Sequence, residues 1–420
     1  MIKAEEYALR REKLIDQLDD GSLSIIFAGV GKKRSADENY DFVVNRNFYY
    51  LTGIEQENSI LMLVKSAGEV STYLFIDEKD EKVEKWIGLK LTADEAKEIS
   101  NIDNVCLRSS FDGKLLAALD EKMTHFGRIS KIYLDLEKEL KIDECKSTNE
   151  FKEQLLEQYK NIEICDLHDN VMRLRIIKSP AEIELIKDAI HTTDIAIRNV
   201  LSKMKTARFE YNLRNIFEFT VKEDLNASLA FHSIVASGKN AVILHYPNPV
   251  DTLKDGDLVL LDVGACKSNY CADISRTFPR NGEFSEIQKK IYSIVLDCNK
   301  QTANFIRPGI LLKEVQDFAL NFLAEECVAK GLIESKDKIR EVYYHNVSHH
   351  LGLDTHDGND RQAKLAPGMV ITCEPGLYFK ELGIGVRIED DVLVTIDGSE
   401  VLSKDILKEV KEIEKILRNR

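Results

Sequence analysis

The sequence is poor in proline and tryptophan and lacks any long apolar run. It has 7 prolines and 1 tryptophan in 420 residues, and 44% of its residues are hydrophobic. No apolar stretch approaches the ~20 residues that cross a bilayer, and residues 1–18 mix charged and apolar side chains without the apolar core of a signal peptide. These absences exclude disordered, collagen-like and membrane-spanning classes. We therefore expect a globular, cytoplasmic protein without a membrane partner.

The chain also lacks an excess of positive charge and any closely paired cysteines. It carries 58 Lys and Arg against 72 Asp and Glu, a net charge of -14, and no basic patch stands out. Such a charge repels phosphate backbones, so nucleic acid is not an expected partner. The 8 cysteines are scattered without a CxxC pair, which argues against a disulfide framework or a zinc knuckle.

The length and the distribution of proline predict two domains. All prolines lie at or after position 180, and we place the domains at residues 1–172 and 173–420. In the first, apolar runs alternate with charged helical stretches, which predicts an α/β domain. The runs are residues 23–27, 60–64, 72–76 and 131–134, and the helical stretches are residues 93–99 and 150–159. This domain shows no convergent His, Cys or acidic residues, so we interpret it as a scaffold, oligomerisation or substrate-restricting domain.

The second domain repeats one plan. Ser179-Pro-Ala-Glu182 and Ser285-Glu-Ile-Gln288 are capping boxes that open helices. After each helical stretch come a glycine, a carboxylate and a glycine at equal spacing: Gly256, Asp262 and Gly264, then Gly368, Glu374 and Gly376. The same offset relates all three pairs. This pattern predicts an internal duplication with a pseudo-two-fold axis and a site in the cleft between the halves.

Each of the two carboxylates lies on an apolar strand that we expect to fold back as a hairpin. Turns at residues 267–269 and 380–383 would place Asp262 opposite Asp273, and Glu374 opposite Glu389. Like charges this close are destabilising unless a cation compensates them or one carboxylate is protonated. The alternative is that one member of each pair faces solvent. Four convergent carboxylates can hold two divalent ions, and oxygen ligands favour Mn, Fe or Co. A nitrogen donor is expected as well.

Histidines cluster just before the second hairpin. Of 9 histidines, four fall between positions 345 and 356: His345, His349, His350 and His356. One of them can bind metal while the others orient substrate or shuttle protons. His245 precedes the first hairpin in the same way, although a single histidine is as easily a core or loop residue.

These segments resemble the metal-dependent pita-bread peptidases, specifically the Xaa-Pro aminopeptidase (aminopeptidase P) family. The matching segments are residues 261–264, 271–278, 348–357, 373–378 and 385–391, with residues 47–53 in the first domain. The resemblance implies an N-terminal α/β domain and a C-terminal pita-bread domain. It also implies removal of the N-terminal residue from peptides with proline second, by a homo-oligomer (dimer or tetramer).

The resemblance further implies the site residues. The metal ligands would be Asp262, Asp273, His349, Glu374 and Glu389, holding two divalent ions, with Mn²⁺ expected and Co²⁺, Fe²⁺ or Zn²⁺ as alternatives. A bridging water or hydroxide would attack the peptide carbonyl, with Glu374 handling its proton. Residues placed near the substrate by the same resemblance are His245, His345, His356, Arg361, Tyr378 and Arg387.

Two alternatives stay open. A prolidase would cleave Xaa-Pro dipeptides with the same ligands, although Ser348-His349-His350 and the Tyr-Leu-Thr-Gly segment at residues 50–53 resemble aminopeptidase P more closely. A catalytically silent pita-bread protein would act as a binding module. Such a protein would be expected to have lost metal ligands, and here the whole set is present.

Overall fold

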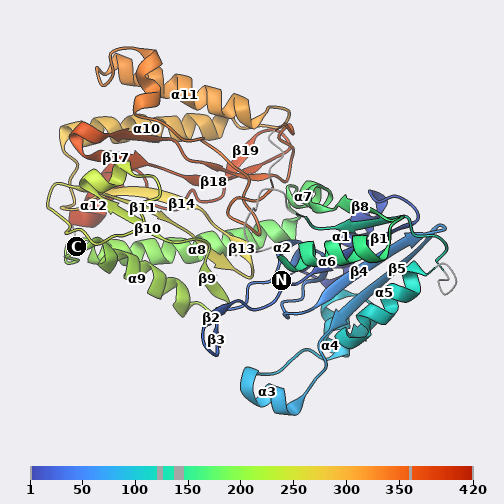
Figure 1. Ribbon diagram of the computed structural model, residues 1–420. Helices are drawn as coiled ribbons and strands as arrows, with labels where there is room; N and C mark the ends of the chain where they lie inside the picture. Colours follow the sequence, from blue (N-terminus) through green and yellow to red (C-terminus); the bar gives the residue numbers. More distant parts are fainter. Residues whose placement is uncertain (1, 121–125, 137–145, 359–361, 419–420) are drawn as a thin grey trace. The chain divides into compact units, whose positions relative to one another are not determined.

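The computed structural model describes residues 2–120, 126–136, 146–358 and 362–418. The chain forms two compact units, Ile2–Arg175 and Ile176–Arg420. Each is considered by itself (Figure 1).

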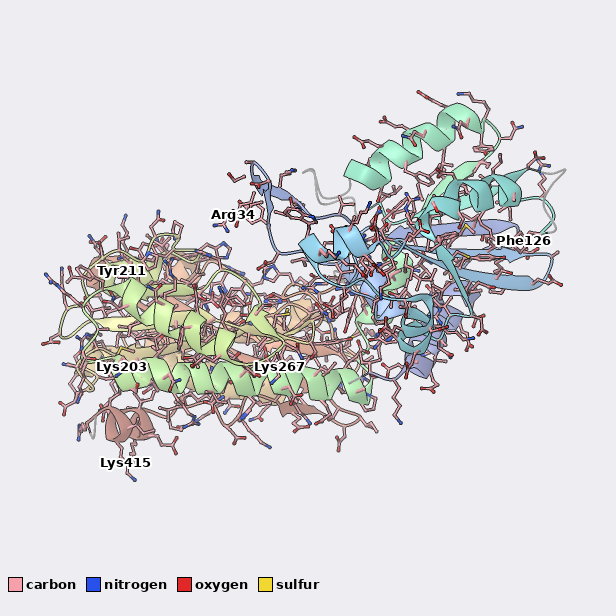
Figure 2. All side chains as sticks on the ribbon, turned by 90° about the horizontal axis from the view of Figure 1, so that it is seen from below. Arg34, Phe126, Lys203, Tyr211, Lys267 and Lys415 are labelled. Atoms are coloured by element: carbon pink, nitrogen blue, oxygen red, sulfur yellow. The ribbon has the colours of Figure 1, made fainter. Side chains whose placement is uncertain are left out.

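A six-stranded sheet organises the first unit. Its strand order is β6-β5-β4-β1-β7-β8, with β7 parallel to β1 and β8, and β4 antiparallel to β1 and β5. The strands are β1 (Ser22–Phe27), β4 (Ile60–Ser66), β5 (Glu69–Ile76), β6 (Asn104–Leu107), β7 (Lys131–Leu134) and β8 (Glu163–Asp166), and a separate hairpin joins β2 (Lys33–Ser35) to β3 (Glu38–Asn39). Arg34 lies in that hairpin (Figure 2). The predicted strands are confirmed.

Helices complete the first unit. They are α1 (Ala4–Asp16), α2 (Arg46–Thr52), α3 (Glu81–Ile87), α4 (Ala93–Ser100), α5 (Phe111–Leu119), α6 (Lys146–Gln158) and α7 (His168–Arg175). Aromatic contacts join α5 to the sheet, because the rings of Phe75 and Phe111 meet edge to face with centroids 5.2 Å apart. The predicted α/β character of this domain is therefore confirmed.

The first unit also holds a polar cluster that was not predicted. Asp135 Oδ1 lies 2.9 Å from His168 Nδ1, and Asp135 Oδ2 accepts a hydrogen bond from Asn47. Arg175 donates to Asn47 Oδ1 over 2.7 Å. These residues are far apart in sequence and meet only where β7 ends beside α2 and α7. No local pattern could have revealed them.

In the second unit, strands lie between two helix pairs (Figure 1). The helices are α8 (Pro180–Lys203), α9 (Glu210–Glu223), α10 (Glu286–Phe305), α11 (Leu312–Ala329) and α12 (Val410–Arg418). Ser179 and Glu182 form the predicted capping box of α8, and Ser285 and Gln288 form that of α10. Both predicted helix starts are confirmed.

The strands of this unit form short sheets in two similar sets. They are β9 (Ala227–Leu229), β10 (Ile234–Ser237), β11 (Leu258–Val263), β12 (Ala265–Lys267), β13 (Tyr270–Cys271), β14 (Ile274–Pro279), β15 (Val370–Cys373), β16 (Gly376–Phe379), β17 (Ile384–Arg387), β18 (Asp390–Val394) and β19 (Ser399–Val401). The paired orders are β10-β11-β14, β13-β12-β9, β15-β18-β19 and β16-β17. Gly256 and Gly368 take φ values of 92° and 91°, as equivalent positions of a repeat should. The duplicated plan is present.

The first hairpin differs from its predicted register. Asp262 pairs with Ser275 rather than Asp273, because the turn consists of Ser268 and Asn269 alone. Both turn residues have positive φ, 49° and 69°, which a two-residue hairpin turn of this hand requires. Moving the centre of the turn by one residue moves the pairing partner of Asp262 by two residues. The side chains of Asp262 and Asp273 therefore still lie on the same face.

The second hairpin has its predicted register. Cys373 pairs with Asp390 in β15–β18, and Gly376 pairs with Arg387 in β16–β17. Both registers place Glu374 opposite Glu389, between the two strand pairs. The turn at residues 380–382 ends at Gly383 in a left-handed conformation.

Candidate metal centre

Four carboxylates and one histidine gather at the middle of the second unit. Asp262 belongs to β11, Asp273 immediately precedes β14, and Glu374 and Glu389 lie between the strand pairs of the second hairpin. Asp273 and Glu389 are buried, with 5% and 2% exposure. Single donor atoms of Asp273, His349 and Glu389 all lie within 4.8 Å of one another. The predicted carboxylate pairs therefore converge in one cluster.

His349 presents one ring nitrogen to this cluster. Its Nε2 lies 3.4 Å from Asp273 Oδ2 and 3.6 Å from Glu374 Oε1. Its Nδ1 lies 3.0 Å from the carbonyl oxygen of His350, and its backbone N–H bonds to Thr372 Oγ1. The carbonyl fixes the ring orientation and leaves Nε2 as the donor that a metal ion would use.

The electrostatics of the cluster call for a cation. Burial, and then the charges of Asp262 and Glu374, raise the pKa of Asp273 well above its usual range. Burial raises the pKa of Glu374 to about 7, and burial together with Asp273 raises that of Glu389. Carboxylates this close and this dry cannot all be ionised unless positive charge compensates them. Oxygen-rich donors with one imidazole fit divalent ions such as Mn²⁺.

Arg387 is the arginine that reaches into the cluster. It is buried on β17 and donates to Asp262 Oδ2 over 2.7 Å. Its Nε donates to Ser275 Oγ over 2.7 Å, and Ser275 Oγ in turn donates to Glu389 Oε2 over 2.8 Å. Ser275 was not among the predicted site residues, although a hydroxyl two residues after Asp273 on the same strand face was the available signal.

The hydrogen-bond directions around Tyr378 fix the state of His345. Arg387 can only donate, so the Tyr378 hydroxyl accepts from it at 2.9 Å and donates to His345 Nε2 at 2.8 Å. The His345 proton is then on Nδ1, which lies 2.7 Å from the Asn346 carbonyl and 3.6 Å from Glu374 Oε2. Burial, and then the charge of Arg387, lower the pKa of His345 to about 3, so this ring is neutral at pH 7.

The remaining predicted residues lie around the same cluster, with one exception. The His356 ring packs edge-on against His349, with centroids 4.3 Å apart. Burial lowers the pKa of His345 and that of His356, and the charge of His245 contributes to both shifts. His245 therefore lies within electrostatic reach of both rings. Arg361 lies outside the described residues.

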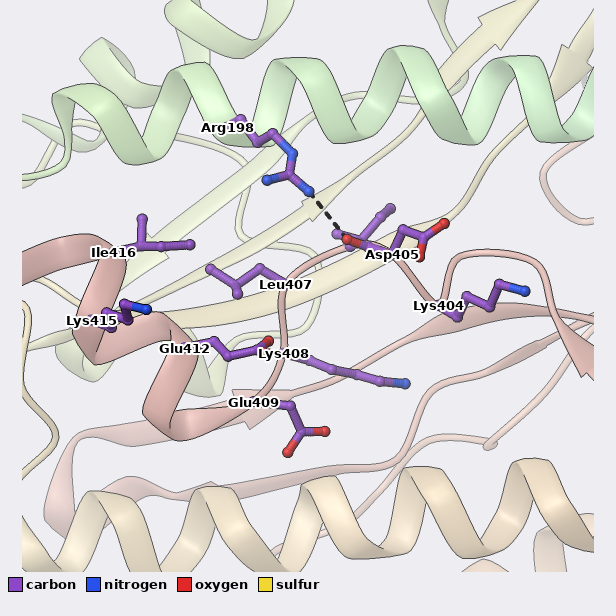
Figure 3. A pocket seen from close by; sticks show the side chains of 10 residues that line it. Arg198, Lys404, Asp405, Leu407, Lys408, Glu409, Glu412, Lys415 and Ile416 are labelled. Atoms are coloured by element: carbon purple, nitrogen blue, oxygen red, sulfur yellow. Dashed lines mark hydrogen bonds between the residues drawn. The ribbon is translucent and has the colours of Figure 1, made fainter.

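A separate cavity lies beside α12, away from the carboxylates (Figure 3). It measures about 370 Å³ and is lined by Arg198 together with residues of the segment 404–416. Arg198 donates to the Asp405 carbonyl over 3.2 Å across it. Its lining mixes both signs of charge and includes none of the clustered carboxylates.

Comparison with known proteins agrees with this geometry. The family model described as "Metallopeptidase family M24" matches residues 184–396, and that described as "Aminopeptidase P, N-terminal domain" matches residues 7–126. The chain belongs to the aminopeptidase P family. Like the family, it is a metal-dependent aminopeptidase.

Relatives in this family match the chain from end to end. An Xaa-Pro aminopeptidase of Escherichia coli K12 is 32% identical over 437 residues, covering 99% of this chain and 98% of the relative. Human Xaa-Pro aminopeptidase 3 is 32% identical over 443 residues, covering 98% of this chain and 85% of the relative.

Solved structures give the same result. A structure from Bacillus anthracis that was assigned as an aminopeptidase P shares 46% identity, with a TM-score of 0.95 over 100% of this chain and 99% of that one. Zinc-substituted E. coli aminopeptidase P in complex with product shares 31% identity, with a TM-score of 0.89 over 100% of this chain and 99% of that one. The pita-bread fold predicted for the second domain is thereby confirmed. Within the described residues, no helix is long and apolar enough to cross a membrane.

Proposed function

We propose that this chain is a dinuclear-metal aminopeptidase that releases the N-terminal residue from peptides with proline at the second position. The observation that carries the proposal is the convergence of carboxylates and His349 in one largely buried cluster, whose carboxylates can all be ionised only beside a cation. The substrate class is supported by the full-length relatives, which are named Xaa-Pro aminopeptidase.

We assign the metal ligands as a set of one imidazole and four carboxylates. They are Asp262, Asp273, His349, Glu374 and Glu389. Two divalent ions bound there would supply Lewis-acid activation of a water and polarisation of the peptide carbonyl. Mn²⁺ is the ion that we expect, because carboxylate oxygens dominate the donor set.

Residues around the ligands would position the substrate and move its protons. Glu374 would accept the proton of the attacking water at a carboxylate oxygen, as the family resemblance implies. Its oxygens lie 3.6 Å from His349 Nε2 and 3.6 Å from His345 Nδ1. In neutral His345 the Nδ1–H bonds to the Asn346 carbonyl and Nε2 accepts from Tyr378, so we assign the ring to the substrate and the tetrahedral intermediate by family resemblance. Tyr378 would act through His345 and Arg387, both of which its hydroxyl contacts.

The substrate itself would be held by side chains at the edge of the cluster. His245 and His356 are exposed residues, and the His356 ring packs against His349, so we assign both to contact a bound peptide. Arg387 has its charge already engaged by Asp262, so we assign it to orient that ligand and the reacting carbonyl beside it. We assign Arg361 to the substrate by family resemblance alone.

The test is hydrolysis of an Xaa-Pro-Yaa tripeptide and the matching Xaa-Pro dipeptide by chelator-stripped protein, before and after addition of Mn²⁺. We expect metal-dependent release of Xaa from the tripeptide and little cleavage of the dipeptide. Preference for the dipeptide would indicate a prolidase. Cleavage of neither, with Mn²⁺ or Co²⁺, would favour a silent binding module.

A further inference from the structure

Glu210 is a fully buried carboxylate at the first position of α9, the helix that carries Tyr211 in Figure 2. Its oxygens accept hydrogen bonds from several donors. Oε1 accepts from the backbone N and the Oγ of Ser237 at 2.7 and 2.8 Å, and from Asn240 Nδ2 at 3.0 Å. Oε2 accepts from the Tyr246 hydroxyl at 3.1 Å and from the backbone N of Asp251 at 3.2 Å. The metal centre does not use this carboxylate directly.

All these donors belong to one stretch of chain, residues 237–251, which we call the His245 segment. The segment consists of the 3-10 helix η3 (Gly238–Val242) and an irregular stretch after it that carries His245. Because the donors stand on both sides of His245, the carboxylate of Glu210 closes the segment into a loop. Asn240 Nδ2 also lies 3.0 Å from the Tyr246 hydroxyl oxygen and 3.0 Å from Asp251 Oδ2, so the same groups bond to one another.

The chemistry of these partners requires a carboxylate. Two of the donors are backbone N–H groups and one is an amide N–H, none of which can accept a hydrogen bond in return. A glutamine at this position would turn an NH₂ group toward at least one of them, leaving buried donors facing each other. A shorter or apolar side chain would leave all of them without this partner.

The apolar side chains of the His245 segment pack beside Tyr378, which bonds to residues next to the metal centre. Val242, Leu244 and Tyr246 pack on a buried cluster that includes Ala241 and Tyr378. The Tyr378 hydroxyl bonds to Arg387 and His345, and Tyr344 donates to the carbonyl of Val242. The segment is therefore held between Glu210 on one side and the Tyr378 network on the other.

We propose that Glu210 is a positioning residue that fixes the His245 segment, and with it the His245 ring, beside the metal centre. The inference rests on the proposed function, which places His245 at the substrate. The second half of the repeat lacks this carboxylate, since α11 begins with Leu312 at the position where α9 begins with Glu210. A carboxylate at this helix position is therefore found in the first half of the repeat and not at the equivalent position of the second.

The first test needs no substrate. Hydrogen exchange of the His245 segment is measured by mass spectrometry in wild type, Glu210→Gln and Glu182→Gln. Glu182 is a matched control, because it is 3% exposed and accepts from Ser179 N and the Tyr270 hydroxyl at 2.9 Å, far from the segment in sequence. We expect faster exchange in residues 237–251 only in Glu210→Gln. Unchanged exchange there would overturn the proposal.

The second test is a double-mutant cycle with His245→Ala on the Mn²⁺-loaded enzyme. If Glu210 acts through His245, Glu210→Gln should lower kcat/KM by about 10- to 100-fold in wild type but by less than about 3-fold when His245 is already alanine. Glu182→Gln should have the same effect in both backgrounds. An equal loss from Glu210→Gln in both would show a merely structural role and contradict the proposal.

The two readouts separate this inference from the proposed function. If the wild type cleaves no Xaa-Pro peptide, the proposed function fails, while hydrogen exchange still decides whether Glu210 fixes the segment. If the wild type is active but His245→Ala is fully active too, the assigned role of His245 fails and positioning of its ring has no catalytic consequence.

Discussion

At the scale of single residues, Ser275 shows how an uncharged side chain can tune the metal centre. Its hydroxyl accepts a hydrogen bond from Arg387 and donates one to Glu389, so it orients both the guanidinium and the carboxylate. Ser275→Ala should weaken Mn²⁺ binding by about 10-fold, a typical cost for losing a group that orients a metal ligand. Ser275→Thr keeps the hydroxyl and should restore the affinity. Calorimetric titration measures both, and unchanged affinity in the alanine variant would refute the role.

The raised pKa of Glu374, about 7 because of burial, gives a second residue-scale prediction for metal-free protein. The folded state holds a proton on this carboxyl that the unfolded chain releases near pH 4.5. Its contribution to stability is therefore complete at low pH and lost as pH rises through about 7. Glu374→Gln removes the titration, so wild type should lose roughly 5 °C of melting temperature relative to this variant between pH 5 and pH 8.

The measurement is thermal unfolding of both proteins in chelator across that pH range. At pH 8, added Mn²⁺ should raise the melting temperature of the wild type more than that of the variant, because the ion then compensates the ionised carboxylate. A constant difference between the two proteins at every pH would contradict the assigned shift.

At the scale of elements, the turn between β12 and β13 sets the position of Asp273. Ser268 and Asn269 occupy left-handed conformations, which Gly and Asn accept and β-branched residues do not. Asn269→Gly should leave stability nearly unchanged, whereas Asn269→Val should lower the free energy of unfolding by about 1–3 kcal/mol. Urea unfolding measures the difference. Equal stability of the two variants would show that the backbone is not constrained there.

The same turn explains why one hairpin was predicted correctly and the other was not. In the second hairpin, Gly383 marks the end of a longer connection, and the predicted centre matched the observed register. In the first, Ser268 and Asn269 both adopt left-handed backbone and form a two-residue turn, so the centre lies one residue later than predicted. Asp262 and Asp273 still lie on one face, as predicted, because strand side chains alternate with a period of two.

At the scale of the whole molecule, the five side chains that we propose as metal ligands could be selected from the sequence because each lies in a short, distinctive segment. Glu210 and the Asp135–His168 pair could not be predicted, since they acquire partners only through tertiary packing. Their nearest partners lie tens of residues or more away in sequence. Periodicity and motif spacing carry no information at that range.

If five side chains form one site for two ions, as we propose, the protein should bind two metal ions per chain, which a measurement of metal stoichiometry can show. Metal-stripped protein is equilibrated with Mn²⁺, freed of unbound ion by gel filtration, and analysed for Mn and protein, with Asp273→Asn in parallel. We expect about two Mn per chain in wild type and at most one in the variant. Fewer than one Mn per wild-type chain, or two in both proteins, would contradict it.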